Sequence, residues 1–139
     1  MKHKTFNIPE VPTIFTIFGA TGDLMEHKIV PSLFFLYKQK RLPKHLRILG
    51  FARREISDKD FRKKIFTVLQ EMNFVKQEKQ VENFLKLFEY VRGDFADAKS
   101  FENLGNKVKS VEDEWKICAN KLYYLAVPPN FMHEIVSNL

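Results

Sequence analysis

Apolar residues along the chain occur in two patterns that alternate. Short runs rich in β-branched and aromatic residues are typical of buried strands, and four such runs lie at residues 13–18, 47–52, 88–92 and 121–127. The stretches between them repeat apolar residues at helical spacing, as at Phe61, Ile65, Val68, Leu69 and Met72. Strands that alternate with helices predict a doubly wound α/β fold, in which a parallel sheet is covered by helices on both faces.

The same spacing predicts where the helices begin and end. The first helix is expected to run from the turn after residue 18 to about Arg41, with a break or a new start at Pro31. A serine or aspartate at positions 57 and 58 is expected to cap the second helix. Three further helices are predicted around residues 81–88, over residues 97–115 and after residue 128.

Length and composition fit one domain. The chain has 139 residues, of which 45% are hydrophobic, and we expect residues 13–139 to fold as one unit after a loose lead-in at residues 1–12. The single cysteine, Cys118, cannot form an intrachain disulfide, so a reduced, cytoplasmic setting is expected. We find no signal peptide and no run long enough to span a bilayer, and we predict no membrane partner.

The formal net charge is +6. A basic balance fits a nucleic acid, a membrane surface or a phosphorylated ligand, and it fits an ordinary solvated surface equally well. The positions of individual residues must therefore decide. The histidines show no paired spacing typical of metal ligands, and we find no Ser-His-Asp arrangement, so we predict no metal and no catalytic residue in this segment.

The residues that follow the first strand are unusually small. Gly19, Ala20, Thr21 and Gly22 connect this strand directly to a helix-forming sequence. Glycine accepts positive φ and leaves room for a phosphate beside the backbone, and the free N–H groups and dipole of the next helix favour an anion. The turn is therefore a predicted pyrophosphate site, although turns with two glycines also occur for packing alone.

Charged side chains come directly after this turn. We expect Asp23 to cap the helix, with Glu26 as its capping-box partner, because a carboxylate beside a pyrophosphate would repel it. Lys28 lies about one and a half turns into the helix. It is either a point charge that reaches a phosphate or a solvated helix lysine.

The ends of the other strands indicate which nucleotide is bound. NAD-binding sheets usually place an acidic residue after the second strand, whereas NADP-binding sheets place an arginine nearby for the 2′-phosphate. Arg53 and Arg54 stand at this position, so we predict NADP, the alternative being a surface arginine pair. Asp94, after the third strand, either lines the adenine side or forms a plain turn. Pro128 directs the chain as it leaves the fourth strand beside the site.

Three segments, FGATGDLMEHKIVPSLFFL, ILGFARREIS and YYLAVPP, together resemble one family. The first contains a G-x-x-G-D-L turn followed by a lysine and a proline, the second a glycine and an arginine three apart, and the third a Y-L-A-x-P-P pattern. The matching residues are Gly19, Gly22, Asp23, Leu24, Lys28, Pro31, Gly50, Arg53 and Tyr124–Pro129. This combination resembles the amino-terminal coenzyme domain of glucose-6-phosphate dehydrogenases, over about Thr13–Leu139.

The resemblance implies a Rossmann-like, NADP-binding domain truncated to about four strands. It implies that Gly19–Glu26, with Leu24 and Met25 among them, cradle the cofactor and that Arg53 holds the 2′-phosphate. The whole enzyme would oxidise glucose 6-phosphate with NADP in the pentose phosphate pathway, as a homo-oligomer. The family's E-K-P-F-G and R-I-D-H-Y-L-G-K segments do not occur in these residues. We therefore expect the sugar and the base to need residues beyond Leu139, and this segment alone to be inactive.

Two other readings remain open. An NADP-binding domain of the short-chain dehydrogenase or epimerase type uses a G-x-x-G-x-x-G turn, whose third glycine would fall at Met25. A non-enzymatic basic module, for example one that binds nucleic acid, would lose affinity steeply as salt rises and would not distinguish NADP from NAD. Our prediction favours the dehydrogenase and therefore no nucleic-acid partner.

Overall fold

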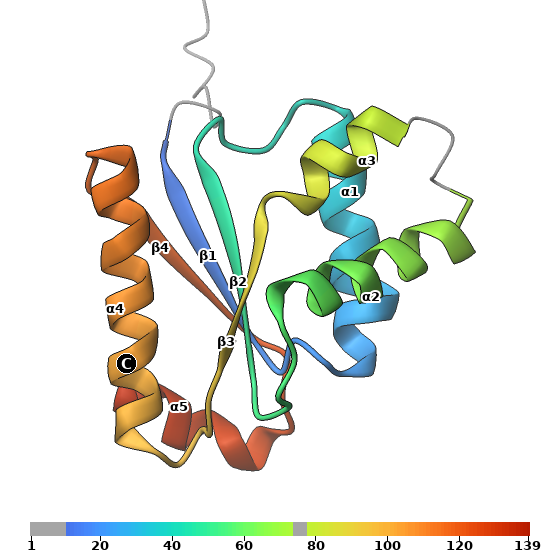
Figure 1. Ribbon diagram of the computed structural model, residues 1–139. Helices are drawn as coiled ribbons and strands as arrows, with labels where there is room; N and C mark the ends of the chain where they lie inside the picture. The colour runs from blue at the N-terminus through green and yellow to red at the C-terminus, as the bar shows by residue number, and fades with distance from the viewer. Residues whose placement is uncertain (1–10, 74–77) are drawn as a thin grey trace, which may run out of the picture.

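The computed structural model describes residues 11–73 and 78–139, in which a parallel sheet lies between two layers of helices (Figure 1). The sheet has four strands in the order β3-β2-β1-β4, and every neighbouring pair is parallel. The strands are β1 (Thr13–Phe18), β2 (Leu46–Ala52), β3 (Phe88–Arg92) and β4 (Asn120–Leu125). The order reverses between β1 and β4, which is the switch point of a doubly wound fold.

Helices cover both faces of the sheet, as predicted (Figure 1). One face carries the short π-helical segment η2 (Met25–Ile29) and helices α1 (Val30–Lys38), α2 (Asp58–Glu71) and α3 (Glu78–Leu85). The other face carries α4 (Ala98–Trp115) and α5 (Met132–Asn138), which follows the 3-10 turn η3 (Pro129–Phe131). The predicted doubly wound α/β class is therefore confirmed.

Alternating side chains of the strands build a separate core on each face. On β1, Ile17 packs with the α1–α3 core, whereas Ile14 and Phe18 pack with the α4–α5 core. Phe18 lies with its ring centroid 5.1 Å from Phe51 of β2 and 6.0 Å from Phe101 of α4. The central strands are apolar on both sides because both faces of the sheet are covered.

Most element boundaries agree with the sequence prediction. The strands at residues 13–18 and 88–92 are confirmed with the predicted bounds, while β2 begins one residue earlier, at Leu46. The strand predicted at residues 121–127 is instead Asn120–Leu125, because Asn120 pairs with Thr13 and the pairing stops opposite Phe18. Of the lead-in predicted for residues 1–12, only Val11 and Pro12 lie within the described residues.

The first helix ends before the predicted Arg41. Helix α1 stops at Lys38, and two residues later Lys40 has a φ of 57°. In this left-handed conformation the N–H of Lys40 donates to the carbonyl oxygen of Tyr37 and that of Arg41 to Leu36, which closes the helix end. A left-handed residue of this kind usually is glycine, so a lysine gave no sequence signal.

Pro31 marks a new start within the first helix, as predicted. The π-helical turn of η2 is closed by a hydrogen bond from the Val30 N–H to the Met25 carbonyl oxygen, and regular α-helix begins at Val30. Proline has no N–H to donate to a carbonyl four residues back. The change of hydrogen-bond pattern directly before Pro31 therefore has a local cause in the sequence.

Candidate functional site

A hollow of about 510 Å³ opens at the carboxyl edge of the sheet. This edge is the lower end of the sheet in Figure 1, where the loops after all four strands gather. The lining residues are Gly19, Thr21, Gly22, Ala52, Arg53, Arg54, Phe95, Ala126, Val127 and Pro128. They come from the last residue of β2 and from the segments after β1, β2, β3 and β4. They surround the switch point between β1 and β4, where ligands of doubly wound sheets bind.

Gly19 allows the chain to turn tightly at the end of β1. Its φ is +84°, and a Cβ atom there would lie 2.2 Å from the Ala126 carbonyl oxygen. The Gly19 N–H donates to the Phe51 carbonyl oxygen over 2.9 Å, so the turn is held against β2 as well as against the segment after β4. No side chain fits at Gly19 because backbone closes the space around it.

Gly22 has a different role from Gly19. A Cβ atom there would meet only the Gly19 carbonyl oxygen, at 3.4 Å, which is an ordinary contact. The N–H of Gly22 donates to that same oxygen over 3.1 Å and closes the turn. The fold itself thus leaves space open at Gly22, on the wall of the hollow, where a phosphate could approach the main chain.

Two arginines of the loop after β2 supply positive charge to the hollow. Arg53 and Arg54 both line it, and both side chains are exposed. The structure thus brings both arginines on which the NADP prediction rests to the same hollow as the glycine turn. Guanidinium groups bind phosphate oxygens through paired, charge-assisted hydrogen bonds.

The capping box predicted at Asp23 and Glu26 is wrong. Asp23 is already part of the first helical turn, and no side chain caps the segment. The helical hydrogen bonds begin earlier, with the N–H of Glu26 donating to the Gly22 carbonyl oxygen over 3.4 Å. Both carboxylates still lie in the first turn, where they complement the helix dipole.

Asp23 and Glu26 lie close to a histidine that the sequence had not grouped with them. One possible ligand atom from each of Asp23, Glu26 and His27 lies within 4.8 Å of the others, and Nδ1 of His27 lies 2.9 Å from the main-chain oxygen of Asp23. Surface carboxylates of this kind are common without a bound ion. We assign this cluster no role.

The other residues predicted from the turn lie in different surroundings. Ala20 and Met25 are buried, at 4% and 2% exposure, and both pack in the α1–α3 core. Leu24 is 39% exposed and Lys28 is also exposed, and neither lines the hollow. Of the segment Gly19–Glu26, the hollow is therefore lined by Gly19, Thr21 and Gly22.

Asp94 forms a turn, and Pro128 lies at the hollow. The Asp94 carboxylate accepts a hydrogen bond from the Ala96 N–H over 2.9 Å, and the Asp94 N–H donates to the Ser100 hydroxyl. Pro128 lines the hollow next to Ala126 and Val127. The neighbour of Asp94, Phe95, also lines the hollow, and the sequence analysis had not pointed to it.

The residues that line the hollow can bind an anion but offer no acid or base. None of the described lining residues is an aspartate, a glutamate or a histidine. What they offer instead is main-chain N–H groups, the Thr21 hydroxyl and two guanidinium groups.

The described helices also include none long and apolar enough to cross a membrane.

A glycine turn at a switch point, with arginines after the second strand, defines a dinucleotide-binding domain of the Rossmann type. Comparison with protein families narrows this class. Residues 16–139 match the family described as the NAD-binding domain of glucose-6-phosphate dehydrogenase, so the chain belongs to this family. The match supports a nicotinamide dinucleotide as the cofactor class.

Individual relatives agree with this family. The chain is 34% identical to the glucose-6-phosphate 1-dehydrogenase of Leuconostoc mesenteroides over 132 residues, which cover 95% of the chain and 27% of the relative. It is 36% identical to the Schizosaccharomyces pombe enzyme over 124 residues, which cover 88% of the chain and 25% of that protein. The chain thus spans about a quarter of the length of these relatives.

Solved structures of the family share the fold. A glucose-6-phosphate dehydrogenase in complex with its substrate glucose 6-phosphate superposes with a TM-score of 0.86 at 34% identity, covering 94% of this chain and 27% of the other. The enzyme from Mycobacterium avium superposes with a TM-score of 0.78 at 24% identity, covering 92% and 26%, which supports the fold alone.

Proposed function

We propose that this chain is the coenzyme-binding domain of an NADP-dependent glucose-6-phosphate dehydrogenase, which oxidises glucose 6-phosphate to 6-phosphogluconolactone. The observation that carries the choice of NADP is the position of Arg53 and Arg54. They line the same hollow as the glycine turn, after the second strand of the sheet. The family assignment and the substrate complex of a relative support the reaction.

The residues around the hollow fit a dinucleotide. The pyrophosphate is assigned to the turn Gly19–Gly22, where the main chain is bare and the space at Gly22 is open. The 2′-phosphate is assigned to Arg53 and Arg54, because two guanidinium groups favour a doubly charged phosphate over a neutral hydroxyl. Phe95 and Val127 supply apolar surface to the same hollow.

When bound, NADP supplies the hydride acceptor for oxidation of the sugar at C1. The described residues of this chain bind and orient the cofactor, and we assign none of them as the base that takes the proton of the C1 hydroxyl. The sugar and its phosphate are assigned to parts of the enzyme other than this domain. We further propose a cytoplasmic setting, since the single cysteine fits a reduced compartment.

Calorimetric titration of the full-length protein with NADP and with NAD tests the proposal. We expect NADP to bind more tightly, and NADPH to form when glucose 6-phosphate is added. Equal affinity for the two cofactors would contradict the assignment of the arginines. Binding that falls steeply with salt but does not distinguish the cofactors would favour a basic module instead.

A further inference from the structure

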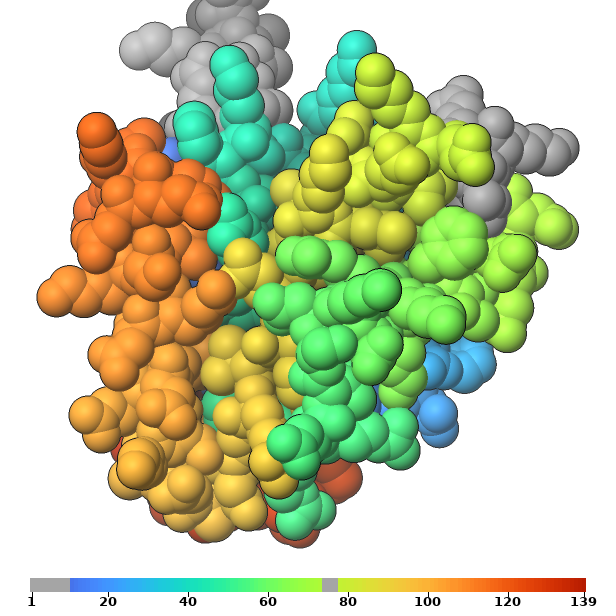
Figure 2. Space-filling model, in the orientation of Figure 1, coloured from blue at the N-terminus to red at the C-terminus, as the bar shows by residue number. Residues whose placement is uncertain are grey.

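The backbone of the arginine loop is held by the neighbouring strand. The loop between β2 and α2 starts with Arg53 and Arg54, whose side chains are exposed. At the end of β3, Nε of Arg92 donates to the Arg53 carbonyl oxygen over 3.2 Å, and the Tyr90 hydroxyl donates to the Arg54 carbonyl oxygen over 2.6 Å. Figure 2 shows the two segments side by side on the surface, in green and yellow.

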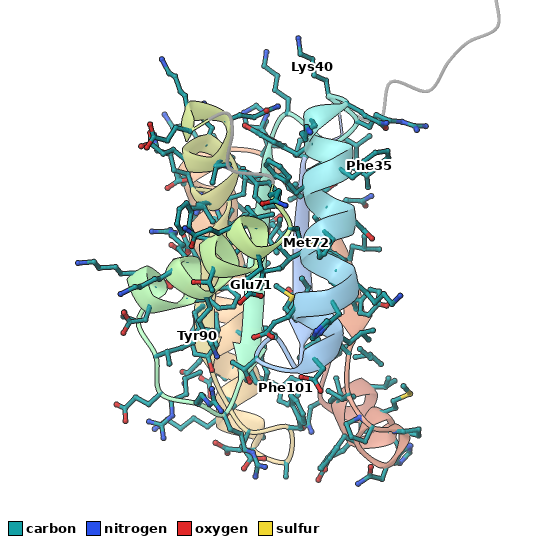
Figure 3. The ribbon with its side chains drawn as sticks, turned by 90° about the vertical axis from the view of Figure 1, so that its right-hand side faces the viewer. Phe35, Lys40, Glu71, Met72, Tyr90 and Phe101 are labelled. Atoms are coloured by element: carbon teal, nitrogen blue, oxygen red, sulfur yellow. The ribbon has the colours of Figure 1, made fainter. Side chains whose placement is uncertain are left out.

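Tyr90 is well placed to act as a permanent donor. Its ring packs on Phe61, with 5.2 Å between the ring centroids, and Figure 3 shows it beside the loop that leads into α2. Burial raises the pKa of Tyr90 above its ordinary value of 10.0, so the hydroxyl keeps its proton at neutral pH. The Tyr90 N–H also donates to Oδ1 of Asp58 over 2.7 Å, which ties the start of α2 to the same strand.

Arg92 adds a third guanidinium group to this side of the molecule. Its Nη1 lies 3.6 Å from Oε2 of Glu55, and its side chain is 60% exposed. A guanidinium group stays charged at any physiological pH, so this donor is always present. Arg92 does not line the hollow itself, so its effect passes through the Arg53 carbonyl group and through its charge.

The two carbonyl groups that accept these hydrogen bonds belong to consecutive residues, and this determines the orientation of the Arg54 side chain. A peptide unit is planar, so holding the oxygens of Arg53 and Arg54 fixes the peptide planes on both sides of the Arg54 Cα. The direction in which this side chain leaves the backbone is then fixed as well. Two-pronged pairing with a phosphate depends on that direction, and a loop already in place loses less conformational entropy when the ligand binds.

We propose that Tyr90 and Arg92 are positioning residues that hold the Arg53–Arg54 backbone and thereby set the preference for a dinucleotide with a 2′-phosphate. This inference rests on the function proposed above. A residue with a merely structural role would affect both cofactors alike. A residue that positions the arginines must change the ratio of the NADP affinity to the NAD affinity. The reason is that the arginines are assigned to the 2′-phosphate, which NAD lacks.

The test compares Tyr90→Phe, Arg92→Met and the double variant with the unaltered full-length protein. Tyr90→Phe keeps the ring against Phe61 and removes only the hydroxyl, whereas Arg92→Met keeps an unbranched stem. Tyr37→Phe is the matched control, since this half-buried tyrosine packs on Phe34 and Phe84 away from the loop. The readout is the dissociation constant of NADP and of NAD by calorimetry, with circular dichroism and thermal unfolding for each variant.

We expect each single variant to weaken NADP by about two- to tenfold, as the loss of one hydrogen bond implies, and to leave NAD almost unchanged. The double variant should weaken NADP further, and Tyr37→Phe should change neither. An unchanged affinity ratio in all three variants, or an equal loss for both cofactors, overturns the inference while the proposed function stands. No preference for NADP in the unaltered protein overturns both. If one variant unfolds, the other decides.

Discussion

Gly19 and Ala126 approach so closely that no side chain fits between them. A Cβ atom on Gly19 would lie 2.2 Å from the Ala126 carbonyl oxygen and 3.0 Å from Cγ1 of Val127. The first turn of the site is thereby locked to the segment after β4, on the far side of the switch point. The Ala126 N–H also donates to the Phe18 carbonyl oxygen over 2.9 Å, so the two walls of the hollow are joined directly beside this close approach.

We expect Gly19→Ala to destabilise the fold. The φ of +84° alone costs a non-glycine residue roughly 1–2 kcal/mol, and the contact with Ala126 adds to it because backbone cannot rotate away. Urea unfolding followed by circular dichroism measures the loss. Gly105→Ala on α4 is the control, since a Cβ atom there meets nothing within 4 Å. It should stabilise the helix by up to about 1 kcal/mol, and equal effects at both positions would contradict the locked turn.

Gly22→Val should separate binding from folding. The fold leaves space at Gly22, so the variant should give the circular dichroism spectrum of the unaltered protein. The added side chain would occupy the space assigned to the pyrophosphate, so nucleotide binding should be lost. Calorimetric titration with NADP checks this. Retained NADP binding in a folded Gly22→Val protein would rule out the assignment of the pyrophosphate to the turn Gly19–Gly22.

The fold was largely predictable because burial leaves a strong pattern. Strands β1 and β3 are short apolar runs between turns, and their bounds came out as predicted. The end of β4 was not predictable in the same way. Val127 continues the apolar run, but strand pairing with β1 stops at Leu125, which is a fact of the sheet and not of the local sequence.

The site was predictable only where residue type carries the chemistry. Gly19, Gly22 and Arg53 gave such signals, and the structure places all three around one hollow. Phe95 and Ala126 are ordinary apolar residues that line it only because the ends of parallel strands meet at one edge. The Asp23 cap was wrong because the helical hydrogen bonds begin at the Gly22 carbonyl group, before the residue type suggests a start.

Arg53→Ala should weaken NADP specifically. Loss of a charge-assisted hydrogen bond costs about 1.5–3 kcal/mol, or roughly ten- to a hundredfold in affinity. The affinity for NAD should stay the same, because NAD has no 2′-phosphate and makes no such hydrogen bond. Titration of the full-length protein with both cofactors measures the difference. Lys63→Ala removes an equal charge from an exposed position on α2 and controls for long-range attraction. A similar loss for NADP and NAD would show that Arg53 does not read the 2′-phosphate.

Glu112 makes stability depend on pH in the acid range. A hydrogen bond from the Ala119 N–H, 2.7 Å long, lowers the pKa of Glu112 below its ordinary value of 4.5, and Lys121 adds to this. A depressed folded-state pKa means that the stabilisation is present above 4.5 and is lost as the pH falls through the lower value. The same contact holds the turn between α4 and β4.

Glu112→Gln should therefore flatten the acid limb of the stability curve. The variant should be less stable than the unaltered protein at neutral pH, and the difference should shrink as the pH falls below 4.5. Thermal unfolding over a pH series measures this. Glu102→Gln on the same helix removes an exposed carboxylate as a control. A difference that stays constant with pH would show that the Glu112 charge does not contribute.

Residues 1–139 expressed alone should form no NADPH from glucose 6-phosphate. Positioning of a substrate against the reacting group supplies roughly 7–11 kcal/mol of a reaction barrier, and the described residues around the hollow include no carboxylate or imidazole to act as base.

Strand β4 forms one edge of the sheet, and Leu122, Tyr123 and Tyr124 on it are 55%, 41% and 40% exposed. An open edge with apolar side chains favours association between chains, so we expect weak NADP binding and self-association. On one sample, NADPH absorbance measures turnover, light scattering measures self-association, and calorimetry measures NADP binding. Turnover by this polypeptide would contradict our assignment of the sugar and the base to other parts of the enzyme. A monomer that binds NADP tightly would instead show that the exposed edge of β4 needs no partner.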